Sequence, residues 1–384
     1  MEKKRMKSGE TPDPDKPMRS GFTTGACATA VAKGATQLLL TEVPPAQAVV
    51  SLPAGFDHSF ELIEQELMSD GTATCATIKD AGDDPDATHL AKIIAHVSWR
   101  DEPGVELDGG IGVGRVTKPG LPVPVGEAAI NPVPRRMITE AVTQVLAEHG
   151  TARGVRVVIS VPDGEEIAKK TLNSRLGILG GISILGTRGV VVPFSTSAYK
   201  ASVVQAISVA QASGCDHIVL TTGGSSEKYA MKMMPELPEE AFIQMGDFVG
   251  FAIKHGKRLG MKRISLVGMP GKFAKVAQGV MMVHSKSAPV DFGFLASVAR
   301  ETGAGDELAQ AIEEANTATQ VADMMTEAGY LPYFEKICTY ACRHCLEHAG
   351  GGVTVEVVLV TMKGMELGRA EISELDDSNW SKES

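Results

Sequence analysis

The sequence predicts two domains of the α/β and α+β classes: an N-terminal α+β domain with an antiparallel sheet, and a doubly wound, Rossmann-like α/β domain. Three observations lead to this prediction. The chain has 384 residues, more than one hydrophobic core usually organises. Residues 48–100 form short β-rich runs, which favour an antiparallel sheet. From residue 155 onward strands alternate with helices, which is typical of a parallel sheet.

Composition narrows the function classes. The net charge of −10 argues against nucleic-acid binding through a generally basic surface. No apolar run approaches the ~20 residues of a membrane helix, and the first residues lack the apolar core of a secretory signal. Six cysteines in a chain of this length fit a reducing compartment. We therefore expect a cytoplasmic protein with neither a membrane nor a nucleic-acid partner.

The expected domain order follows from shifts in pattern along the chain. Residues 1–17 read as a disordered, charged tail. An N-terminal α+β domain over 18–150 and an α/β domain over 151–370 follow, the second with extra C-terminal helices and a β-hairpin. Residues 371–384 form an acidic tail.

The first domain begins with a turn and a helix over residues 19–40, capped by Thr23 or Thr24, whose hydroxyls can accept from free backbone N–H groups. Its small residues would let another backbone approach closely. Cys27 falls in the first turn, where the helix dipole lowers a thiol pKa. A reactive nucleophile and a small buried side chain both remain open for it, and the second is favoured.

Four β-rich runs come next: AVVSL, SFELIEQEL, TATCATIK and LAKIIAHVSW. Between the last two lies an acidic turn, residues 80–89, which includes Asp83 and Asp84. Its spacing does not match an EF-hand. An Asp-rich turn is the default interpretation, and a substrate-facing acid or base is the main alternative.

A basic Gly/Pro loop over residues 109–136 is the most distinctive segment, because its glycines and prolines exclude a helix or a central strand. It carries Lys118, Arg135 and Arg136 with few acids between them. It suits an anionic partner of some size, or a stiff linker between domains. A helix follows it, with Pro134 in the first turn and an end at residues 150–154.

The second domain is expected to start with a buried strand at 155–162 and a helix at 165–177. A glycine-rich loop, a helix from about Tyr199 to Ala212, the strand HIVLTTGG, a long helical region, the strand RISLVG and another helix come next. Residues 306–350 read as helical with a bend near Pro332, and a hairpin turns around Lys363 and Gly364.

Three glycine-containing loops of this domain could meet at the carboxyl ends of its strands. The first, residues 177–189, contains Gly180 and Gly181 and would let backbone N–H groups approach a ligand. The second contains Thr222, Gly223, Gly224 and Glu227, of which Glu227 could accept from ribose hydroxyls. The third, residues 268–275, offers Lys272 and Lys275 beside a helix start. None is a standard nucleotide fingerprint, so tight turns remain the alternative to a shared pocket.

Further polar residues complete the candidates. Asp247, in a helical setting, could face that pocket, and His284 is either a general base or a structural histidine. The spacing of Cys338, Cys342 and Cys345 is that of radical iron–sulfur enzymes, but it also puts all three thiols on one helix face. Packing is the favoured role, and a zinc site is the main alternative.

Taken in order, several strings resemble the cobalt-precorrin-5B C1-methyltransferase family: FTTGACATA, DAGDDPDATH, GIGVGRVTKPGLPVPVGEAAINPVPRRMI, LGILGGISILGTRGVVVPFS, LTTGGSSEK, QMGDFVGFA and GMPGKFAKVAQGVMMVHS. The resemblance is specific from about residue 19 to 300 and looser to about 370. The cysteine triad lies outside the family pattern.

The resemblance implies methyl transfer from S-adenosylmethionine to carbon 1 of cobalt-precorrin-5B, giving cobalt-precorrin-6A in anaerobic cobalamin biosynthesis. Cobalt enters only as part of the tetrapyrrole substrate, and no metal site is expected in the protein. We expect Asp83, Asp84 or His284 as general base. We expect the donor against Gly180, Gly181, Thr222, Gly223, Gly224, Glu227 and Asp247. Substrate carboxylates would meet Lys118, Arg135 and Arg136, and Lys272 and Lys275 could serve either ligand.

Two other functions stay in view. An NAD(P)-dependent reductase would need GxGxxG after the first strand of the sheet, where VPDGEE stands instead. A non-catalytic corrinoid carrier or scaffold would bind the substrate without turnover. A homodimer, transient contacts with other corrin-pathway enzymes and acceptance of the metal-free precursor are left open.

Overall fold

The computed structural model describes residues 18–284 and 287–374 as a mixed α/β chain of two compact units. The first unit holds residues up to Thr117 together with Pro122–Ser195, and the second holds Lys118–Leu121 together with the chain from Thr196 onward. The units therefore divide at residue 195, not at the predicted 150. The expected tail over 1–17 and most of the acidic tail, 375–384, lie outside the described residues.

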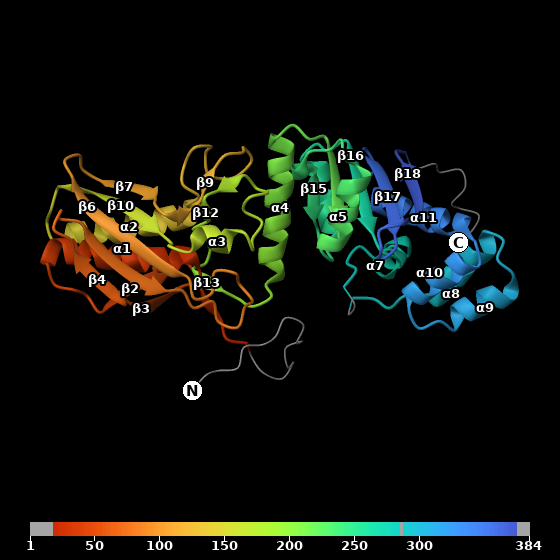
Figure 1. The fold of residues 1–384 in the computed structure, drawn as a ribbon, viewed down its shortest axis with the longest axis horizontal. Helices are drawn as coiled ribbons and strands as arrows, with labels where there is room; N and C mark the ends of the chain where they lie inside the picture. The colour runs from red at the N-terminus through yellow and green to blue at the C-terminus, as the bar shows by residue number, and fades with distance from the viewer. Residues whose placement is uncertain (1–17, 285–286, 375–384) are drawn as a thin grey trace. The chain divides into compact units, whose positions relative to one another are not determined.

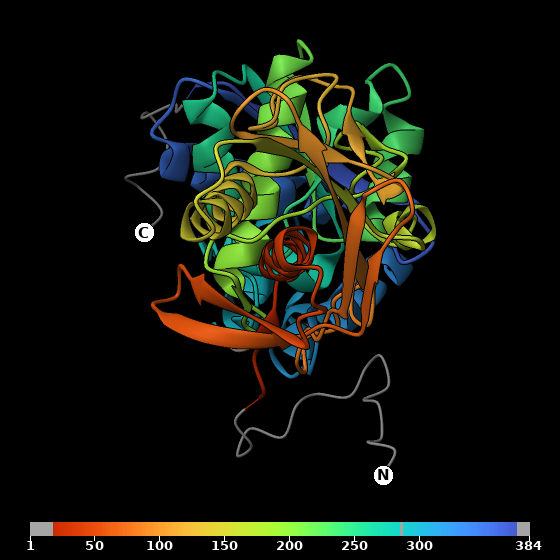
Figure 2. The same ribbon diagram turned by 90° about the vertical axis from the view of Figure 1, so that its left-hand side faces the viewer.

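Helix α1 (Thr24–Thr41) is the centre of the first unit, and Figure 2 shows it end-on among the strands. The Thr23 hydroxyl caps it by accepting from the N–H of Ala26 at 3.2 Å, which confirms the predicted start. Its small residues bring neighbours close: a Cβ on Gly25 would lie 2.6 Å from Pro134 of helix α2 (Pro132–Glu148). Most of α1 is buried, as its small residues predict.

The main sheet of this unit has the strand order β4-β5-β6-β10-β7. Its strands are β4 (Glu64–Leu67), β5 (Ala73–Ile78), β6 (Lys92–Arg100), β7 (Val105–Gly109) and β10 (Gly154–Ser160). All pairs are antiparallel except β10 with β7. The predicted antiparallel sheet is thus present, but β10 was expected to open the second domain. It belongs here because Val155, Val157 and Ile159 pack into the first core, beside Ile93.

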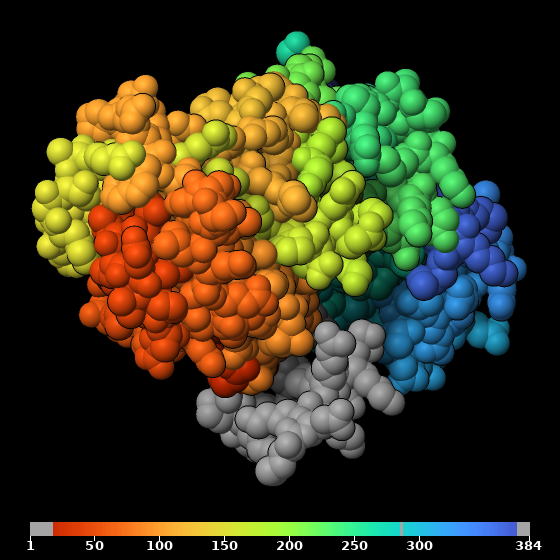
Figure 3. All heavy atoms as spheres, turned by 60° about the vertical axis from the view of Figure 1, so that its left-hand side comes forward, coloured from red at the N-terminus to blue at the C-terminus, as the bar shows by residue number. Residues whose placement is uncertain are grey.

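Short strands complete the first unit: β1 (Gly21–Phe22), β2 (Gln47–Leu52), β3 (Phe56–Glu61), β8 (Gly112–Val113), β9 (Arg115–Val116), β11 (Ile178–Leu179), β12 (Gly181–Ile182) and β13 (Val190–Val191). β2 and β3 form a separate hairpin. The basic loop is less extended than predicted, because β8 and β9 pair with β12 and β11, and α2 already begins at Pro132. The segment before residue 195, yellow-green in Figure 3, lies at the surface of this unit.

One predicted helix of this region is much shorter than expected. Only α3 (Gly164–Ala168) is helical where 165–177 was predicted. The following turns are stabilised by bonds from Thr171 and Asn173 to nearby backbone groups, which compete with a helix.

The second unit contains a five-stranded sheet of order β15-β14-β16-β17-β18 (Figure 1). Its strands are β14 (His217–Thr221), β15 (Phe242–Gln244), β16 (Arg263–Gly268), β17 (Thr354–Val360) and β18 (Glu366–Ile372). The first four in spatial order run parallel, and β17 and β18 form the predicted antiparallel hairpin. β15 and the turn after it interrupt the predicted long helical region, because Phe242 and Ile243 are buried against the sheet.

Helices cover both faces of this sheet. Leu220 and Leu266 share the larger core with most of the helices, whereas Val219 and Val267 share a smaller core that includes Ala230 of α5. The helices are α4 (Thr196–Ala212), α5 (Gly224–Met233), α6 (Val249–Arg258), α7 (Pro270–Ala277), α8 (Phe292–Glu301), α9 (Asp306–Glu313), α10 (Ala318–Glu327) and α11 (Leu331–Ala349), with a 3-10 turn at Glu239–Ala241. Pro332 lies in the first turn of α11 and begins a helix instead of bending one.

The acidic turn after β5 depends on a buried ion pair. Lys79 is 1% exposed, and its ammonium donates to Asp86 at 2.7 Å. Burial opposes ionisation of Asp86, but the charge and hydrogen bond of Lys79 and the hydrogen bonds from Thr88 outweigh it, so the pKa of Asp86 is lowered.

We therefore expect Asp86→Asn to lower the free energy of unfolding by about 3 kcal/mol, because it leaves a buried ammonium without its counter-charge. Urea unfolding of the full chain, followed by circular dichroism, measures this loss. Glu64→Gln is the matched control, since Glu64 pairs with Lys92 on the exposed edge of the same sheet, and we expect it to cost less than about 1 kcal/mol. Equal losses in the two variants would contradict the structural role of the buried pair.

Candidate functional site

The structure distributes the predicted site residues over both compact units. The first unit holds Asp83, Asp84, Arg135, Arg136, Gly180 and Gly181. The second holds Lys118, Thr222, Gly223, Gly224, Glu227, Asp247, Lys272, Lys275 and His284. We describe the two groups separately.

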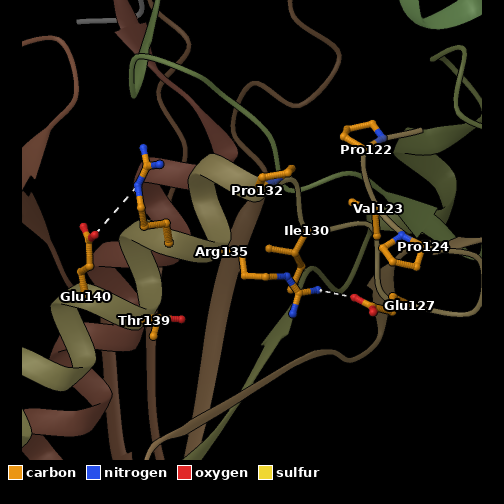
Figure 4. A pocket seen from close by; sticks show the side chains of 10 residues that line it. Pro122, Val123, Pro124, Glu127, Ile130, Pro132, Arg135, Thr139 and Glu140 are labelled. Atoms are coloured by element: carbon orange, nitrogen blue, oxygen red, sulfur yellow. Dashed lines mark hydrogen bonds and ion pairs between the residues drawn. The ribbon is translucent and has the colours of Figure 1, made fainter. Parts of the chain in front are cut away.

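A hollow of about 570 Å³ opens in the first unit at the start of α2 (Figure 4). Its wall is largely apolar, with Pro122, Pro124 and Pro132 among the lining residues. Arg135 and Arg136 also line it, as the interpretation of the basic loop as an anion receptor requires. An apolar wall with a few charged groups is the usual composition of a small-molecule site.

The charges of this hollow come from the first turns of α2. Arg135 donates to Glu127 at 3.1 Å, and Figure 4 shows the two side chains pointing toward each other. Arg136 lies 3.9 Å from Glu140, and both side chains of that pair are more than 60% exposed. The first turn of α2 has no acidic residue to offset the positive end of the helix dipole. A carboxylate that enters the hollow can therefore replace Glu127 or Glu140 as the partner of an arginine, because exposed ion pairs of this kind are weak.

The acidic turn has mainly structural partners. Asp83 accepts from the backbone N–H of Arg19 at 2.6 Å, and Asp84 accepts from that of Phe194 at 2.9 Å. Hydrogen bonding from Arg19 holds the pKa of Asp80 at about 2. These contacts tie residues 19 and 194 to the turn, and they favour the Asp-rich-turn interpretation for Asp83 and Asp84.

The loop with Gly180 and Gly181 does not lie at the sheet of the second unit, contrary to the prediction. Its strands β11 and β12 pair with β9 and β8 in the first unit. A Cβ on Gly181 would lie 2.1 Å from the carbonyl oxygen of Gly112. Close packing of two backbones therefore explains that glycine without a ligand.

The other two loops do meet, at the carboxyl edge of the second sheet. Thr221, the last residue of β14, is in register with Gln244 of β15 and with Val267 of β16. The three strands therefore end together. Their following segments carry Thr222–Gly224, Asp247 and Lys272 to one edge, where ligands bind in open α/β sheets.

Hydrogen bonds and charges connect these segments. Glu227 is buried in the first turn of α5 and accepts from the side-chain amide of Gln244 at 2.8 Å. Lys272 of α7 lies 2.9 Å from Asp247. Asp247 could be predicted as a site residue from the sequence but Gln244 could not, because nothing about a neutral amide in a predicted helix indicates a ligand contact. Tyr199, which also reaches this edge, was missed for the same reason.

The remaining cations are engaged elsewhere in the second unit. Lys118 forms an ion pair with Glu240, and its hydrogen bond is the main cause of the lowered pKa of that carboxyl. The structure thus assigns Lys118 to a different unit from Arg135 and Arg136, although all three were predicted in one loop. The buried Lys275 donates to the carbonyl oxygen of His284 at 3.2 Å, so it supports the chain after α7.

The three clustered cysteines are fully buried on one face of α11. Burial raises the pKa of Cys338 to about 12 and raises those of Cys342 and Cys345 as well. Burial likewise raises the pKa of Cys27 to about 12, which favours the small buried side chain over the nucleophile alternative. The four thiols are packing residues in this structure.

Two negative findings apply to residues 18–284 and 287–374 only. Within them, no three His, Cys, Asp or Glu side chains gather in an arrangement suited to a metal ion. Within the same ranges, no helix is both long enough and apolar enough to cross a bilayer.

Comparison with known proteins decides the family. The family model described as CbiD matches residues 11–193, and the model described as CbiD, C-terminal domain, matches 282–371. The chain belongs to the CbiD family. The first match ends beside the boundary at 195, so the CbiD family also favours a first unit longer than the predicted 18–150.

Relatives of high identity carry one enzyme name. The cobalt-precorrin-5B C(1)-methyltransferase of Geobacillus sp. (strain WCH70) is 60% identical over 94% of this chain and 99% of the relative. That of Priestia megaterium is 62% identical over 94% of this chain and 98% of the relative. The 'cobalamin biosynthesis protein (cbiD) from Archaeoglobus fulgidus', a crystal structure, is 34% identical over 66% of this chain and 78% of that one, with a TM-score of 0.37.

The burial of the cysteines predicts the reactivity of the native protein. Five of the six thiols are buried and Cys215 is partly exposed, so we expect an aromatic disulfide reagent to label only Cys215 at about pH 8. All six should react after denaturation. Absorbance of the released thiolate counts the labelled cysteines, and Cys215→Ser should abolish native labelling. Rapid labelling of a residue in α11 would contradict the packing role.

Proposed function

We propose that this chain is a cobalt-precorrin-5B C(1)-methyltransferase that uses S-adenosylmethionine in anaerobic cobalamin biosynthesis. The observation that carries the proposal is the 60% identity, over nearly the whole chain, with relatives of that name. The alternative, an NAD(P)-dependent reductase, would need a GxGxxG fingerprint, and VPDGEE stands in the place where it was expected. The proposal includes a cytoplasmic location.

In methyl transfer to carbon, the main contribution of the protein is to align the methyl donor with the accepting carbon atom. The C–S bond of the sulfonium breaks, its electron pair stays on sulfur, and the macrocycle supplies the pair for the new bond at carbon 1. Holding the two ligands in line and excluding water are contributions of proximity and orientation. A base that takes a proton from the ring system completes the step. Asp83, Asp84 and His284 remain the proposed bases.

We assign the donor to the carboxyl edge of the second sheet, as a doubly wound, Rossmann-like domain would hold it. Thr222, Gly223 and Gly224 offer backbone groups there, and Glu227 accepts from ribose hydroxyls. Support comes from the common register at which β14, β15 and β16 end.

We assign substrate carboxylates to the hollow at the start of α2. A corrinoid precursor carries several acetate and propionate arms, and Arg guanidinium groups bind carboxylates in a two-pronged fashion. Arg135 and Arg136 line an apolar-walled space of about 570 Å³, which supports the assignment. Lys118 stays a predicted substrate contact, although it already forms an ion pair with Glu240.

Turnover tests the function. Incubated anaerobically with methyl-labelled S-adenosylmethionine and cobalt-precorrin-5B, the protein should transfer one labelled methyl group to the tetrapyrrole and release S-adenosylhomocysteine. Mass spectrometry of both products measures this. Binding of the tetrapyrrole without transfer of label would instead support a carrier or scaffold. Reaction with the metal-free precursor shows whether cobalt is needed.

Substitution tests the substrate assignment. Arg135→Ala and Arg136→Ala should each raise the KM for the tetrapyrrole about tenfold, because a charge-assisted hydrogen bond is lost, and should leave the KM for the donor nearly unchanged. Steady-state kinetics with each substrate varied in turn measures both values. Arg156→Ala is the control, since Arg156 pairs with Glu106 on the sheet of the same unit, away from the hollow lining. An equal rise in both KM values would refute the assignment.

A further inference from the structure

Tyr199 of α4 is fixed at the carboxyl edge of the second sheet. Its ring lies on the turn after β15, where a Cβ on Gly246 would be 2.7 Å from the Tyr199 hydroxyl oxygen. Gly246 also has a φ of +60°, which disfavours any other residue. The hydroxyl donates to the carbonyl oxygen of Gln244 at 3.4 Å, and the Phe248 ring packs 5.5 Å away, centroid to centroid.

Negative charges face this ring. Gln244, whose carbonyl holds the Tyr199 hydroxyl, also donates through its side chain to Glu227. Asp247 follows Gly246 directly, with Lys272 at 2.9 Å. Burial, followed by the charges of Asp247 and Glu227, raises the pKa of Tyr199, so its hydroxyl stays neutral near pH 7. The corner thus places the aromatic ring of Tyr199 beside two carboxylates, with the Lys272 ammonium next to Asp247 and the Lys200 ammonium over Phe248.

Packing alone does not account for this tyrosine. Its side chain is 39% exposed, and its neighbour Lys200 places its ammonium over Phe248, 5.2 Å from the centroid. The aromatic ring that supports Tyr199 is therefore the one that receives the lysine, while Tyr199 itself remains partly exposed. An exposed aromatic face beside two carboxylates is a receptor for an organic cation.

We propose that Tyr199 receives the sulfonium of S-adenosylmethionine on its exposed face, in the field of Glu227 and Asp247, while Lys272 takes the carboxylate of the donor's amino-acid end. This inference rests on the proposed function. The two positive groups of the donor are suited to the two carboxylates, and its one negative group is suited to the Lys272 ammonium.

Methyl transfer changes the charge of the group that Tyr199 would contact. When the methyl group leaves, the sulfur keeps the bonding electron pair and becomes a neutral thioether. The attraction to the Tyr199 face and to the carboxylates is then lost, which favours release of the product over the donor. Because the positive charge on sulfur already declines in the transition state, this contact strengthens donor binding more than it raises kcat.

Titration calorimetry on the full chain tests the proposal with S-adenosylmethionine and S-adenosylhomocysteine, which differ by the methyl group and its positive charge. The unaltered protein should bind the donor more tightly than the product. Tyr199→Leu should weaken donor binding about tenfold and product binding less than about twofold, the range of a partly desolvated cation–π contact. Tyr199→Phe should keep the preference, and kcat of Tyr199→Leu at saturating donor should change little.

Two further variants keep the test decisive. Glu227→Gln retains the shape of the corner but removes one charge, so it should lower donor affinity more than product affinity even if Tyr199→Leu does not fold. Tyr229→Leu is the matched control: Tyr229 also packs on a glycine, Gly364, and also donates to a carbonyl oxygen, that of Met362, and its replacement should leave the preference intact.

The outcomes separate the two proposals. If the unaltered protein binds neither ligand, the assignment of the donor to this unit fails. If it binds both equally, or if Tyr199→Leu and Glu227→Gln weaken both ligands to the same degree, the donor assignment stands and the role of Tyr199 as a sulfonium receptor is overturned.

Discussion

The register of three parallel strands is the constraint on which the proposed donor site depends. Thr221, Gln244 and Val267 lie side by side, so the chain leaves β14, β15 and β16 at one level. A shift of β15 by one residue would turn Gln244 to the other face of the sheet and separate it from Glu227. The buried side chains of Phe242 and Ile243 resist such a shift, because each is packed in a different core and the shift would exchange their positions.

Patterns that depend on local chemistry predicted their elements well. The Thr23 cap, the apolar face of α2 and the hairpin at the C-terminus follow from hydroxyl capping, helical periodicity and a Lys-Gly turn, none of which needs a distant partner. The meeting of the loops with Thr222 and Lys272 could also be predicted, because alternating strands and helices imply a parallel sheet whose strand ends coincide.

The predictions that were wrong concern contacts with residues far away in the sequence, which the sequence alone does not show. A run such as VRVVISV reads the same in a parallel and an antiparallel sheet, so nothing local assigned β10 to β6 and the first core. The loop with Gly181 was predicted to bind a ligand because glycine lets another group approach the backbone closely. The group that approaches Gly181 is the backbone of Gly112. The dipole argument for Cys27 considered only its place in the first turn of α1, whereas burial has the largest effect on its pKa. The roles of the site residues themselves remain predictions.

Electrostatics connects the two assigned ligand sites with the overall charge. A chain with a net charge of −10 repels a polycarboxylate at long range, so attraction must arise locally. At the start of α2 the positive end of a helix reinforces Arg136, whose ion pair with Glu140, at 3.9 Å, is exposed. Breaking such a pair costs little, because water already screens it. Near Tyr199 the same excess of acid would favour the proposed donor, since S-adenosylmethionine carries a net positive charge that its product lacks.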